Sequence, residues 1–204
     1  MNVTIIGAGN VGKALATSMH RAGHEVTLSA STPESAHAAA RELGVEPADS
    51  NAAAVADARV VILAVPYVGS GEAVSAEIAS AVAGRIVIDA TNPISPDGSG
   101  LATNGRSAAE EFQKRLPDAS VIKAFNTVFA ANQASPDASI DGYVAGDDAD
   151  AKRVVLDLVE SIGMTPLDVG PLSSARALEG MAFINIGLNA ANGWGWTSAW
   201  RLER

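Results

Sequence analysis

A glycine-rich turn near the start of the sequence constrains the fold more than any other feature. Asn2 to Ile6 is a short apolar run typical of a buried strand, and Gly7-Ala8-Gly9-Asn10-Val11-Gly12 follows it directly. From Lys13 to Arg21 apolar residues recur at helical spacing, so the turn joins a strand to a helix. Glu25 to Leu28 then reads as a second strand, which completes a β-α-β unit. This context gives the pattern G-x-G-x-x-G its meaning as a dinucleotide-binding fingerprint.

Each glycine of the fingerprint has a separate physical reason. Gly7 allows the tight turn, Gly9 lets a pyrophosphate approach the backbone, and Gly12 lets the helix pack closely on the strand. Free N–H groups at the start of the helix would face the phosphates. The alternative is a glycine-rich turn that binds no ligand. We predict that the cofactor is bound by the residues of this turn, namely Gly7, Ala8, Gly9, Asn10, Val11 and Gly12.

The rest of the chain continues the alternation of strand and helix. Strands are predicted at Val60–Val65, Ile86–Ala90, Val121–Phe125, Gly142–Ala145 and Pro166–Val169, and helices at 34–43, 71–82, 107–116, 148–162 and 174–192. Apolar strands separated by helices favour a doubly wound, mostly parallel sheet, the Rossmann fold of the α/β class. No linker divides the chain, so residues 1–204 are expected to form one NAD(P)-binding domain. Its C-terminal helical extension, from about 171 to 204, would complete the acceptor site or a dimer interface.

Composition excludes several classes of function. A formal net charge of −9 disfavours binding to nucleic acid or to anionic lipid, because Lys and Arg supply most of that affinity. The absence of cysteine removes disulfides, thiolate nucleophiles and thiolate metal sites. The three histidines are scattered, and no metal site is expected. No uninterrupted apolar run is long enough to cross a membrane and no signal peptide is evident, so a cytoplasmic location is expected.

The segment after the second strand bears on the choice of nucleotide. NAD-preferring folds carry an acidic residue there, whereas this chain has Ser29-Ala30-Ser31-Thr32-Pro33-Glu34. The hydroxyls of Ser29, Ser31 and Thr32 and a helix that starts at Pro33 would accept a 2′-phosphate, which favours NADP over NAD. The alternative is that these hydroxyls only cap the helix, since no arginine stands in this loop.

Further short motifs lie at the strand ends, and together they are more specific than the glycines. They are Leu63-Ala64-Val65-Pro66, Ile88-Asp89-Ala90-Thr91-Asn92-Pro93, Lys123-Ala124-Phe125-Asn126-Thr127, Gly146-Asp147-Asp148, Gly170-Pro171-Leu172, Ala175-Arg176 and Leu178-Glu179. In this order the motifs resemble the NADP-dependent oxidoreductases of the deazaflavin coenzyme F-420, to which the cytosolic domain of certain metalloreductases is also similar. The resemblance covers nearly the whole chain.

This resemblance implies that NADP(H) lies across the carboxyl ends of the strands. Ala64, Val65 and Pro66 would line the ribose and nicotinamide together with Asn92 and Pro93, while the segment from Ala124 through Asn126 to Thr127 would border the hydride acceptor. It also implies a deazaflavin or a flavin (FMN or FAD) as the second ring, and a homodimer. Two positions depart from the family pattern: Ser31 stands where an arginine is frequent, and Phe129 where a histidine is frequent.

Hydride transfer between two stacked rings needs placement more than acid or base catalysis. We therefore predict no dedicated catalytic side chain, with Asn126 or backbone N–H groups meeting charge on the acceptor. A reductase for a small ketone or imine is the alternative, and it would use a positioned proton donor. A third possibility is a binding domain that senses NADP(H) without turnover.

Several side chains carry both a functional and a structural interpretation. Lys123 is either a proton donor of lowered pKa or an amine that reaches water or a carboxylate, and the latter is favoured. Asp89 is interpreted as a structural hydrogen-bond acceptor in preference to a base, and Tyr67 as a residue that either stacks or donates at the site or only packs. For two further groups, substrate, subunit and packing roles all stay open: Asn185, Asn189 and Asn192 on the last helix, and Trp194, Trp196 and Trp200 in the tail.

Overall fold

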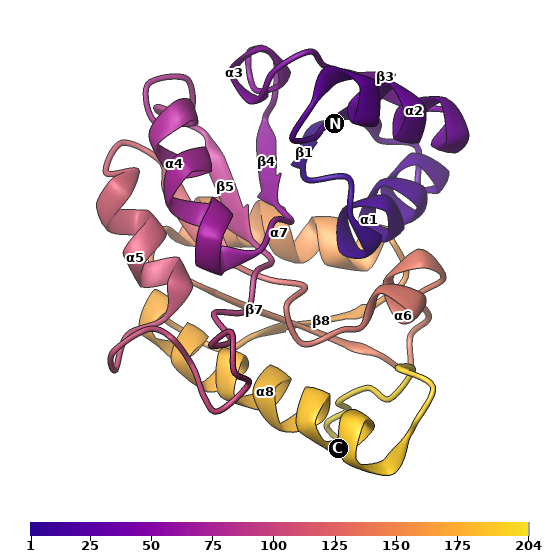
Figure 1. Cartoon of the computed structure of the whole chain (residues 1–204), viewed down its shortest axis with the longest axis vertical. Helices are drawn as coiled ribbons and strands as arrows, with labels where there is room; N and C mark the ends of the chain where they lie inside the picture. The colour runs from indigo at the N-terminus through magenta and orange to yellow at the C-terminus, as the bar shows by residue number, and fades with distance from the viewer. Residues whose placement is uncertain (204) are drawn as a thin grey trace.

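The computed structural model describes residues 1–203 as one eight-stranded sheet with helices on both faces (Figure 1). Arg204, the last residue of the predicted domain, lies outside the described part. The strands are β1 (Asn2–Ile6), β2 (Glu25–Ser29), β3 (Glu46–Pro47), β4 (Val60–Leu63), β5 (Ile86–Asp89), β6 (Ser120–Lys123), β7 (Asp141–Gly146) and β8 (Thr165–Asp168). They lie in the order β3-β2-β1-β4-β5-β6-β7-β8, and every pair is parallel except β6 with β7. The predicted doubly wound, mostly parallel sheet is confirmed.

The helices follow the predicted order with small differences at their ends. They are α1 (Asn10–Arg21), α2 (Pro33–Leu43), α3 (Asn51–Ala54), α4 (Glu72–Ile78), α5 (Ala108–Arg115), α6 (Ala130–Ala134), α7 (Ala149–Ser161) and α8 (Ala175–Asn192), with the short helical turns η1 (Tyr67–Gly71) and η2 (Leu172–Ser174). Helix α1 begins three residues earlier than predicted, inside the glycine fingerprint. The short elements β3, α3 and α6 were not predicted from the sequence. Within residues 1–203, no helix has the length and apolar character needed to cross a bilayer.

Two apolar cores hold the helices to the sheet, one on each face. In β4, Val60 and Ile62 point to the core shared with α1 and α7, while Val61 and Leu63 point to the core shared with α4 and α5. The same alternation recurs in β5 and β6, because successive side chains of a strand point to opposite faces. Phe112 of α5 is among the largest fully buried side chains of the second core.

Strand β7 reverses direction and builds a wall beyond the carboxyl edge of the sheet. It pairs with β6 only through its last two residues, Gly146 opposite Ile122 and Ala145 opposite Lys123. The first four residues of β7 therefore extend past the end of β6, and β8 runs parallel beside them. Helix α8 follows β8, and Figure 1 shows it crossing the part of the molecule opposite α2 and β3. The result is a Rossmann fold with an added wall along its ligand-binding edge.

The junction of β1 and α1 depends on a close approach of two glycines. A Cβ on Gly12 would lie 1.7 Å from the carbonyl oxygen of Gly7, so only glycine fits there. Gly7 itself has φ of +116°, and its Cβ would meet the Ala64 carbonyl oxygen at 2.4 Å. Gly9 differs, because a Cβ there would have no described atom within 4 Å. Gly7 and Gly12 are thus required by packing, whereas Gly9 is not.

This contrast predicts opposite effects on stability. Gly12→Ala should lower the free energy of unfolding by at least about 2 kcal/mol, because the helix must move away from the strand. Gly9→Ser is the matched control, since its side chain enters open space and could cap α1; its stability should stay within about 0.5 kcal/mol of the parent chain. Urea denaturation followed by circular dichroism measures both. Equal losses in the two variants would contradict this account of the turn.

Candidate functional site

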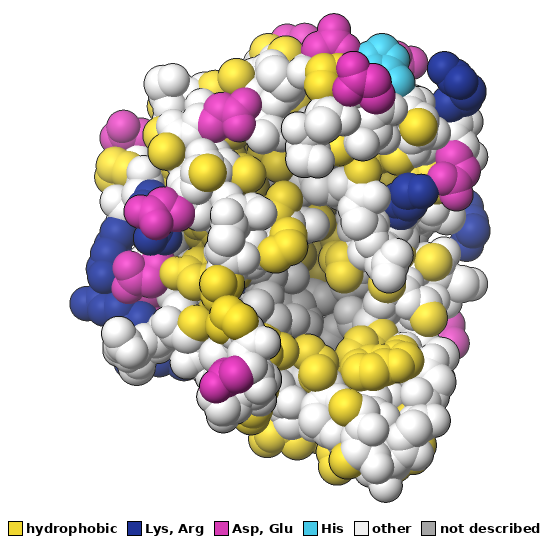
Figure 2. Space-filling view, in the orientation of Figure 1, with side chains coloured by type: hydrophobic (Ala, Val, Ile, Leu, Met, Phe, Trp, Pro, Cys, Tyr) yellow, Lys and Arg dark blue, Asp and Glu magenta, His cyan; other side chains and the backbone are white. Residues whose placement is uncertain are grey.

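A small cavity lies at the carboxyl ends of β5 and β6, beneath the wall made by α8. Its volume is about 150 Å³, and Figure 2 shows the same face of the molecule hollowed near its centre, with hydrophobic side chains around the hollow. The lining residues come from four places in the fold: Val11 of α1; Ala90 and Asn92 after β5; Phe125 to Phe129 and Gln133 after β6; and Ala182, Asn185 and Ile186 of α8. The cavity thus joins the fingerprint helix to the strand-end motifs.

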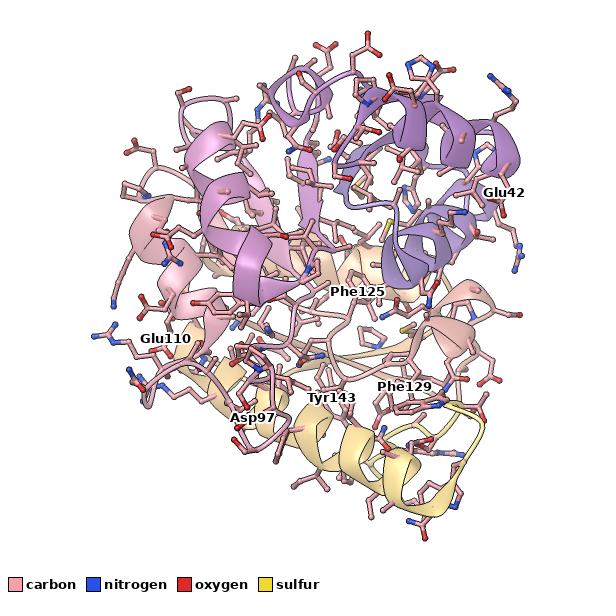
Figure 3. All side chains as sticks on the ribbon, viewed as in Figure 1. Glu42, Asp97, Glu110, Phe125, Phe129 and Tyr143 are labelled. Carbon is pink, nitrogen blue, oxygen red and sulfur yellow. The ribbon has the colours of Figure 1, made fainter. Side chains whose placement is uncertain are left out.

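Two asparagines close one side of this cavity by bonding to each other. The Asn92 amide nitrogen donates to the Asn126 carbonyl oxygen at 2.9 Å, and the Asn126 amide nitrogen donates to Asn92 Oδ1 at 2.9 Å. Asn126 Nδ2 also donates to the carbonyl oxygen of Leu178 on α8 at 3.1 Å. Phe125, just before Asn126, has φ of +67°, which turns the chain sharply at the end of β6. Figure 3 labels Phe125 near the middle of the molecule and Phe129 between α6 and α8.

Two buried amide oxygens next to this cavity are left without a bond. Within residues 1–203, Asn126 Oδ1 and Gln133 Oε1 have no hydrogen-bond partner. Their orientations are fixed, because Asn126 Nδ2 donates to a backbone carbonyl and Gln133 Nε2 donates to the Phe125 and Val128 carbonyls at 2.8 Å each. A buried acceptor without a partner is costly, so this wall of the cavity is suited to a ligand that donates N–H or O–H groups.

The start of α1 is open for an anion. In the described structure no side chain caps α1 and no acid stands in its first turn. Helices α2, α5 and α7 are each capped by a side chain, from Thr32, Ser107 and Asp148 respectively. Gly9, the residue before α1, is exposed and leaves open space where a side chain would stand. Unpaired N–H groups and room beside them are what a diphosphate needs.

The three hydroxyls predicted to meet a 2′-phosphate are in different situations. Ser29 is fully buried, and its hydroxyl donates to Asn51 Oδ1 at 2.8 Å, so a contact between its side chain and a phosphate would first require that bond to break. Its carbonyl oxygen accepts from the Gly7 N–H at 3.0 Å, which fixes the fingerprint turn. Thr32 caps α2 by accepting from the Ser35 N–H. Ser31 is exposed beside this helix start.

The remaining predicted cofactor residues lie at the same edge but differ in exposure. Ala64 and Val65 are half-buried next to Gly7, and Pro66 is exposed. Pro93 and Ala124 are buried, and neither lines the cavity. Of the predicted cofactor residues, three line the cavity together: Val11, Asn92 and Asn126.

A buried cluster of charged side chains lies directly behind these strand ends. Lys123 Nζ donates to Asp89 Oδ2 and to Glu179 Oε1, both at 2.8 Å, and all three side chains are 0 % exposed. The same ammonium donates to the Thr91 carbonyl oxygen at 2.6 Å. Glu179 Oε1 also accepts from the Ala108 N–H at the start of α5, at 2.9 Å. The favoured structural interpretation of Lys123, an amine that reaches water or a carboxylate, is therefore confirmed, with two carboxylates as its partners.

The charges in this cluster act on one another. Burial lowers the pKa of the Lys123 ammonium, but Asp89 and Glu179 more than reverse this, so its pKa is raised above the ordinary value. The lowered pKa considered for a proton donor is thus wrong, because the carboxylates stabilise the charged form. Burial raises the pKa of the Glu179 carboxyl to about 7; Lys123 opposes that shift, and Asp89 adds to it.

Other ambiguous residues are engaged in packing. Asn185 and Asn189 both bond to Ser198 of the tail, which folds back on α8. Asn192 bonds to the Leu188 carbonyl within the same helix. Tyr67 lies edge-on to Phe112, and Trp196 lies edge-on to Phe129. The Trp200 indole N–H donates to the Met181 carbonyl oxygen. Among the described residues, no group of three His, Cys, Asp or Glu side chains could hold a metal ion.

Sequence reasoning missed two residues of this region as parts of a site. Glu179 was noticed only as part of a motif, because Asp89 and Lys123 at the ends of two neighbouring strands already form a neutral pair and gave no signal of a second carboxylate. Gln133 gave no signal, because it lies on a five-residue helix that has no clear apolar period.

Removing the buried ammonium should strongly destabilise the fold. Lys123→Met leaves two carboxyl groups buried without their cation, and the free energy of unfolding should fall by about 3–5 kcal/mol near neutral pH. The folded variant can hold these groups only as protonated acids of raised pKa, so the loss should grow as the pH rises from about 5 to about 8. Urea denaturation at several pH values measures this. The double variant Lys123→Met/Glu179→Gln should lose less, and an unchanged Lys123→Met stability would refute the cluster's role.

Comparison with known proteins relates the chain to a family of oxidoreductases. The model of the family described as NADP oxidoreductase coenzyme F420-dependent matches residues 2–93. A candidate F420-dependent NADP-reductase from Arthrobacter sp. FB24 superposes with a TM-score of 0.89 and 28 % identity, covering 99 % of both chains. A hypothetical protein of Sinorhizobium meliloti, SMa0349, is 35 % identical with a TM-score of 0.75, over 86 % of this chain and 88 % of that one.

A curated relative is longer than this chain. Metalloreductase STEAP3 of Rattus norvegicus is 31 % identical over 183 residues, which are 87 % of this chain and 35 % of that protein. The chain therefore spans about a third of the length of the curated relatives that it resembles. These similarities extend from the glycine fingerprint to the last helix, and they agree with the geometry described above. Residues 2–93 match the family of coenzyme F420-dependent NADP oxidoreductases, and the whole chain shares its fold with the Arthrobacter protein.

Proposed function

We propose that this chain is an NADP(H)-dependent oxidoreductase that transfers a hydride between NADP(H) and a deazaflavin of the coenzyme F-420 type, or a flavin. One observation carries the choice of reaction. Among the described residues that line the cavity, none has a titratable side chain, and the polar ones are Asn92, Asn126, Thr127, Gln133 and Asn185. Ring-to-ring hydride transfer can proceed by placement alone, whereas reduction of a carbonyl or imine is helped by a positioned acid.

The residues present fit the nucleotide at its two ends. The open start of α1 next to Gly9 suits the diphosphate, and the unbonded oxygen of Asn126 suits an N–H donor such as the nicotinamide carboxamide. A cavity of about 150 Å³ holds one six-membered ring and not three fused rings. The acceptor would then lie across the mouth of the cavity, near Phe129 and Trp196, which supports a role for the segment from about 171 onward in completing its site.

The chain's own residues have defined tasks in this reaction. When bound, NADPH supplies the hydride, and solvent supplies the proton that the reduced acceptor also requires. Phe125, Val128 and Ile186 exclude water from the ring. The Asn92–Asn126 pair fixes the position of the strand ends, and the amides beside it can meet charge that develops on the acceptor. No side chain is proposed as a general acid or base.

An acceptor panel tests this function. Purified protein should oxidise NADPH when a deazaflavin is added, with loss of the deazaflavin chromophore, while Gly9→Val should lose at least about a hundredfold in NADPH affinity and should lose turnover. Circular dichroism of Gly9→Val should match the parent chain, because the added side chain meets open space.

The same panel separates the alternatives. It includes FMN, FAD and a set of small ketones and imines. Turnover with FMN or FAD alone would assign a flavin. Turnover only with a ketone or imine would replace the proposed reaction with carbonyl or imine reduction, and tight NADPH binding without any turnover would indicate a sensing domain.

The preference for NADP over NAD has its own test. Ser31→Arg should raise the ratio of the NADH and NADPH dissociation constants roughly tenfold, because an arginine forms charge-assisted hydrogen bonds with a 2′-phosphate. Ser31→Met is the matched control, with similar length and no charge, and it should leave the ratio unchanged. Fluorescence titration measures both constants. If Ser31→Arg and Ser31→Met give the same ratio, the 2′-phosphate does not lie beside Ser31.

A further inference from the structure

The buried cluster of Lys123, Asp89 and Glu179 is connected to the cavity wall through residues that are close in sequence to its lining; Asp89, for example, directly precedes Ala90. Thr91, whose carbonyl accepts from Lys123, stands between Ala90 and Asn92, and both of these line the cavity. Leu178, next to Glu179, accepts from Asn126 of the cavity wall. Such spacing puts the cluster within roughly 10 Å of a ring in the cavity.

The helical spacing of α8 leads to the same placement. Ala182 follows Glu179 by three residues, so the two lie on the same face of α8, and Ala182 lines the cavity. The region between them is buried, since Leu178, Glu179 and Ala182 are all nearly inaccessible to solvent. Protein and not water therefore lies between Glu179 and the cavity. Because protein screens a charge less than water does, the field of a charge on Glu179 reaches further than it would at the surface.

The net charge of the cluster depends on a single proton. With both carboxyls ionised, one lysine and two carboxylates carry a net charge of −1; with Glu179 protonated, the cluster is neutral. Within the described residues, Glu179 Oε2 is buried without a hydrogen-bond partner, so the ionised form leaves one carboxylate oxygen unsolvated. The nicotinamide ring is cationic in NADP⁺ and neutral in NADPH, so the two ring states respond differently to a charge beneath them.

We propose that the Lys123–Asp89–Glu179 cluster sets the relative affinity of the cavity for the oxidised and the reduced nucleotide, through the net charge that it places beneath the nicotinamide ring. This inference rests on the proposed function, because it requires a nicotinamide in the cavity. The anionic cluster favours NADP⁺, and the neutral cluster removes that advantage. By reciprocity, NADP⁺ favours the ionised form of Glu179, so exchanging NADPH for NADP⁺ releases protons.

Within and around the cluster, Glu179 is the group whose protonation changes near neutral pH. Burial raises the pKa of its carboxyl to about 7, with Lys123 lowering it and Asp89 raising it. On α8, Arg176 is engaged by Glu110 of α5, whose pKa that arginine helps to hold at about 2. On α5, Glu111 pairs with Lys114 and Arg106 at the surface, and η2 contributes no charged side chain.

The test compares the two nucleotides across pH. Dissociation constants for NADP⁺ and NADPH are measured by titration calorimetry from about pH 6 to about pH 8.5, and the ratio Kd(NADP⁺)/Kd(NADPH) is followed. In the parent chain this ratio should fall roughly tenfold as the pH rises through 7, the effect of one charge at that distance with an effective dielectric constant near 20. The 2′-phosphate also titrates, near about pH 6, but it is common to both nucleotides and cancels in the ratio.

Two variants locate the effect. Glu179→Gln keeps an oxygen that accepts from Lys123 and Ala108 but cannot ionise, and its ratio should be independent of pH. Glu110→Gln is the matched control: it removes a carboxylate at the same α5–α8 contact that stays ionised over this range, so the fall of the ratio should remain. An unchanged fall in Glu179→Gln, or a flat ratio in the parent chain, would overturn the inference.

A measurement on the parent chain alone guards against a variant that fails to fold. Calorimetry near pH 7 in two buffers of different ionisation enthalpy counts the protons released on binding. Replacing bound NADPH by NADP⁺ should release about half a proton. This is the value expected at the midpoint of the Glu179 titration when its ionisation changes the relative nucleotide affinity tenfold. No proton release would refute the inference while leaving the proposed function intact. If neither nucleotide binds the parent chain, the proposed function fails, and this inference fails with it.

Discussion

One buried ammonium group holds the ligand-binding edge of this protein together. Lys123 ends β6, and its hydrogen bonds reach the end of β5 through Asp89, the loop after β5 through Thr91, and helix α8 through Glu179. Removing these charges from water costs several kcal/mol for each ion, and only close pairing and full hydrogen bonding offset that cost. An apolar set of side chains could fill the same volume, but it would not fix the rotation of α8. We interpret the cluster as a device for specificity, because its directed bonds permit one orientation of the helix.

That orientation determines what faces the cavity. With Glu179 tied to Lys123, the Leu178 carbonyl reaches Asn126, and Ala182, Asn185 and Ile186 line the cavity one and two turns further along α8. The inner surface is then made of apolar groups and amides, while the charges lie behind it. This separation suits the proposed reaction between two rings, since the amides would orient a ring without exchanging protons, and the charges would act on it through their field.

The local part of this architecture could be predicted from the sequence, and the non-local part could not. The β1–turn–α1 unit follows from the close spacing of Gly7 and Gly12, whose contact is determined within six residues. Strands such as β4 were placed well because an uninterrupted apolar run leaves few alternatives. The direction of β7 gave no such signal: either direction buries Val144, and the reversal depends on where the chain returns after α6.

The side chains whose roles the sequence left open also depend on contacts between distant parts of the chain. The sequence indicated that Lys123 reaches water or a carboxylate but not that it has two carboxylates, because Glu179 lies 56 residues away and reaches it only after α8 has packed. Asn185 and Asn189 read as a polar stripe that needs partners, yet the tail that supplies Ser198 has no periodic pattern to show that it folds back. Partners supplied by chain reversal are not visible in a local pattern.

The boundary of the family match divides the site in two. Residues 2–93 contain the fingerprint, the strand end at Ala64 to Pro66 and Asn92, to which we assign the nucleotide in the proposed function. Asn126, Phe129, Gln133 and the lining residues of α8 lie beyond that boundary, and they form the wall that an acceptor would meet. Since the two halves are joined through Lys123 and the Asn92–Asn126 pair, the second half can vary in shape while the nucleotide stays in place. On the proposed function, the choice of acceptor would depend on the segment from β6 onward, which includes Phe129 of the cavity lining.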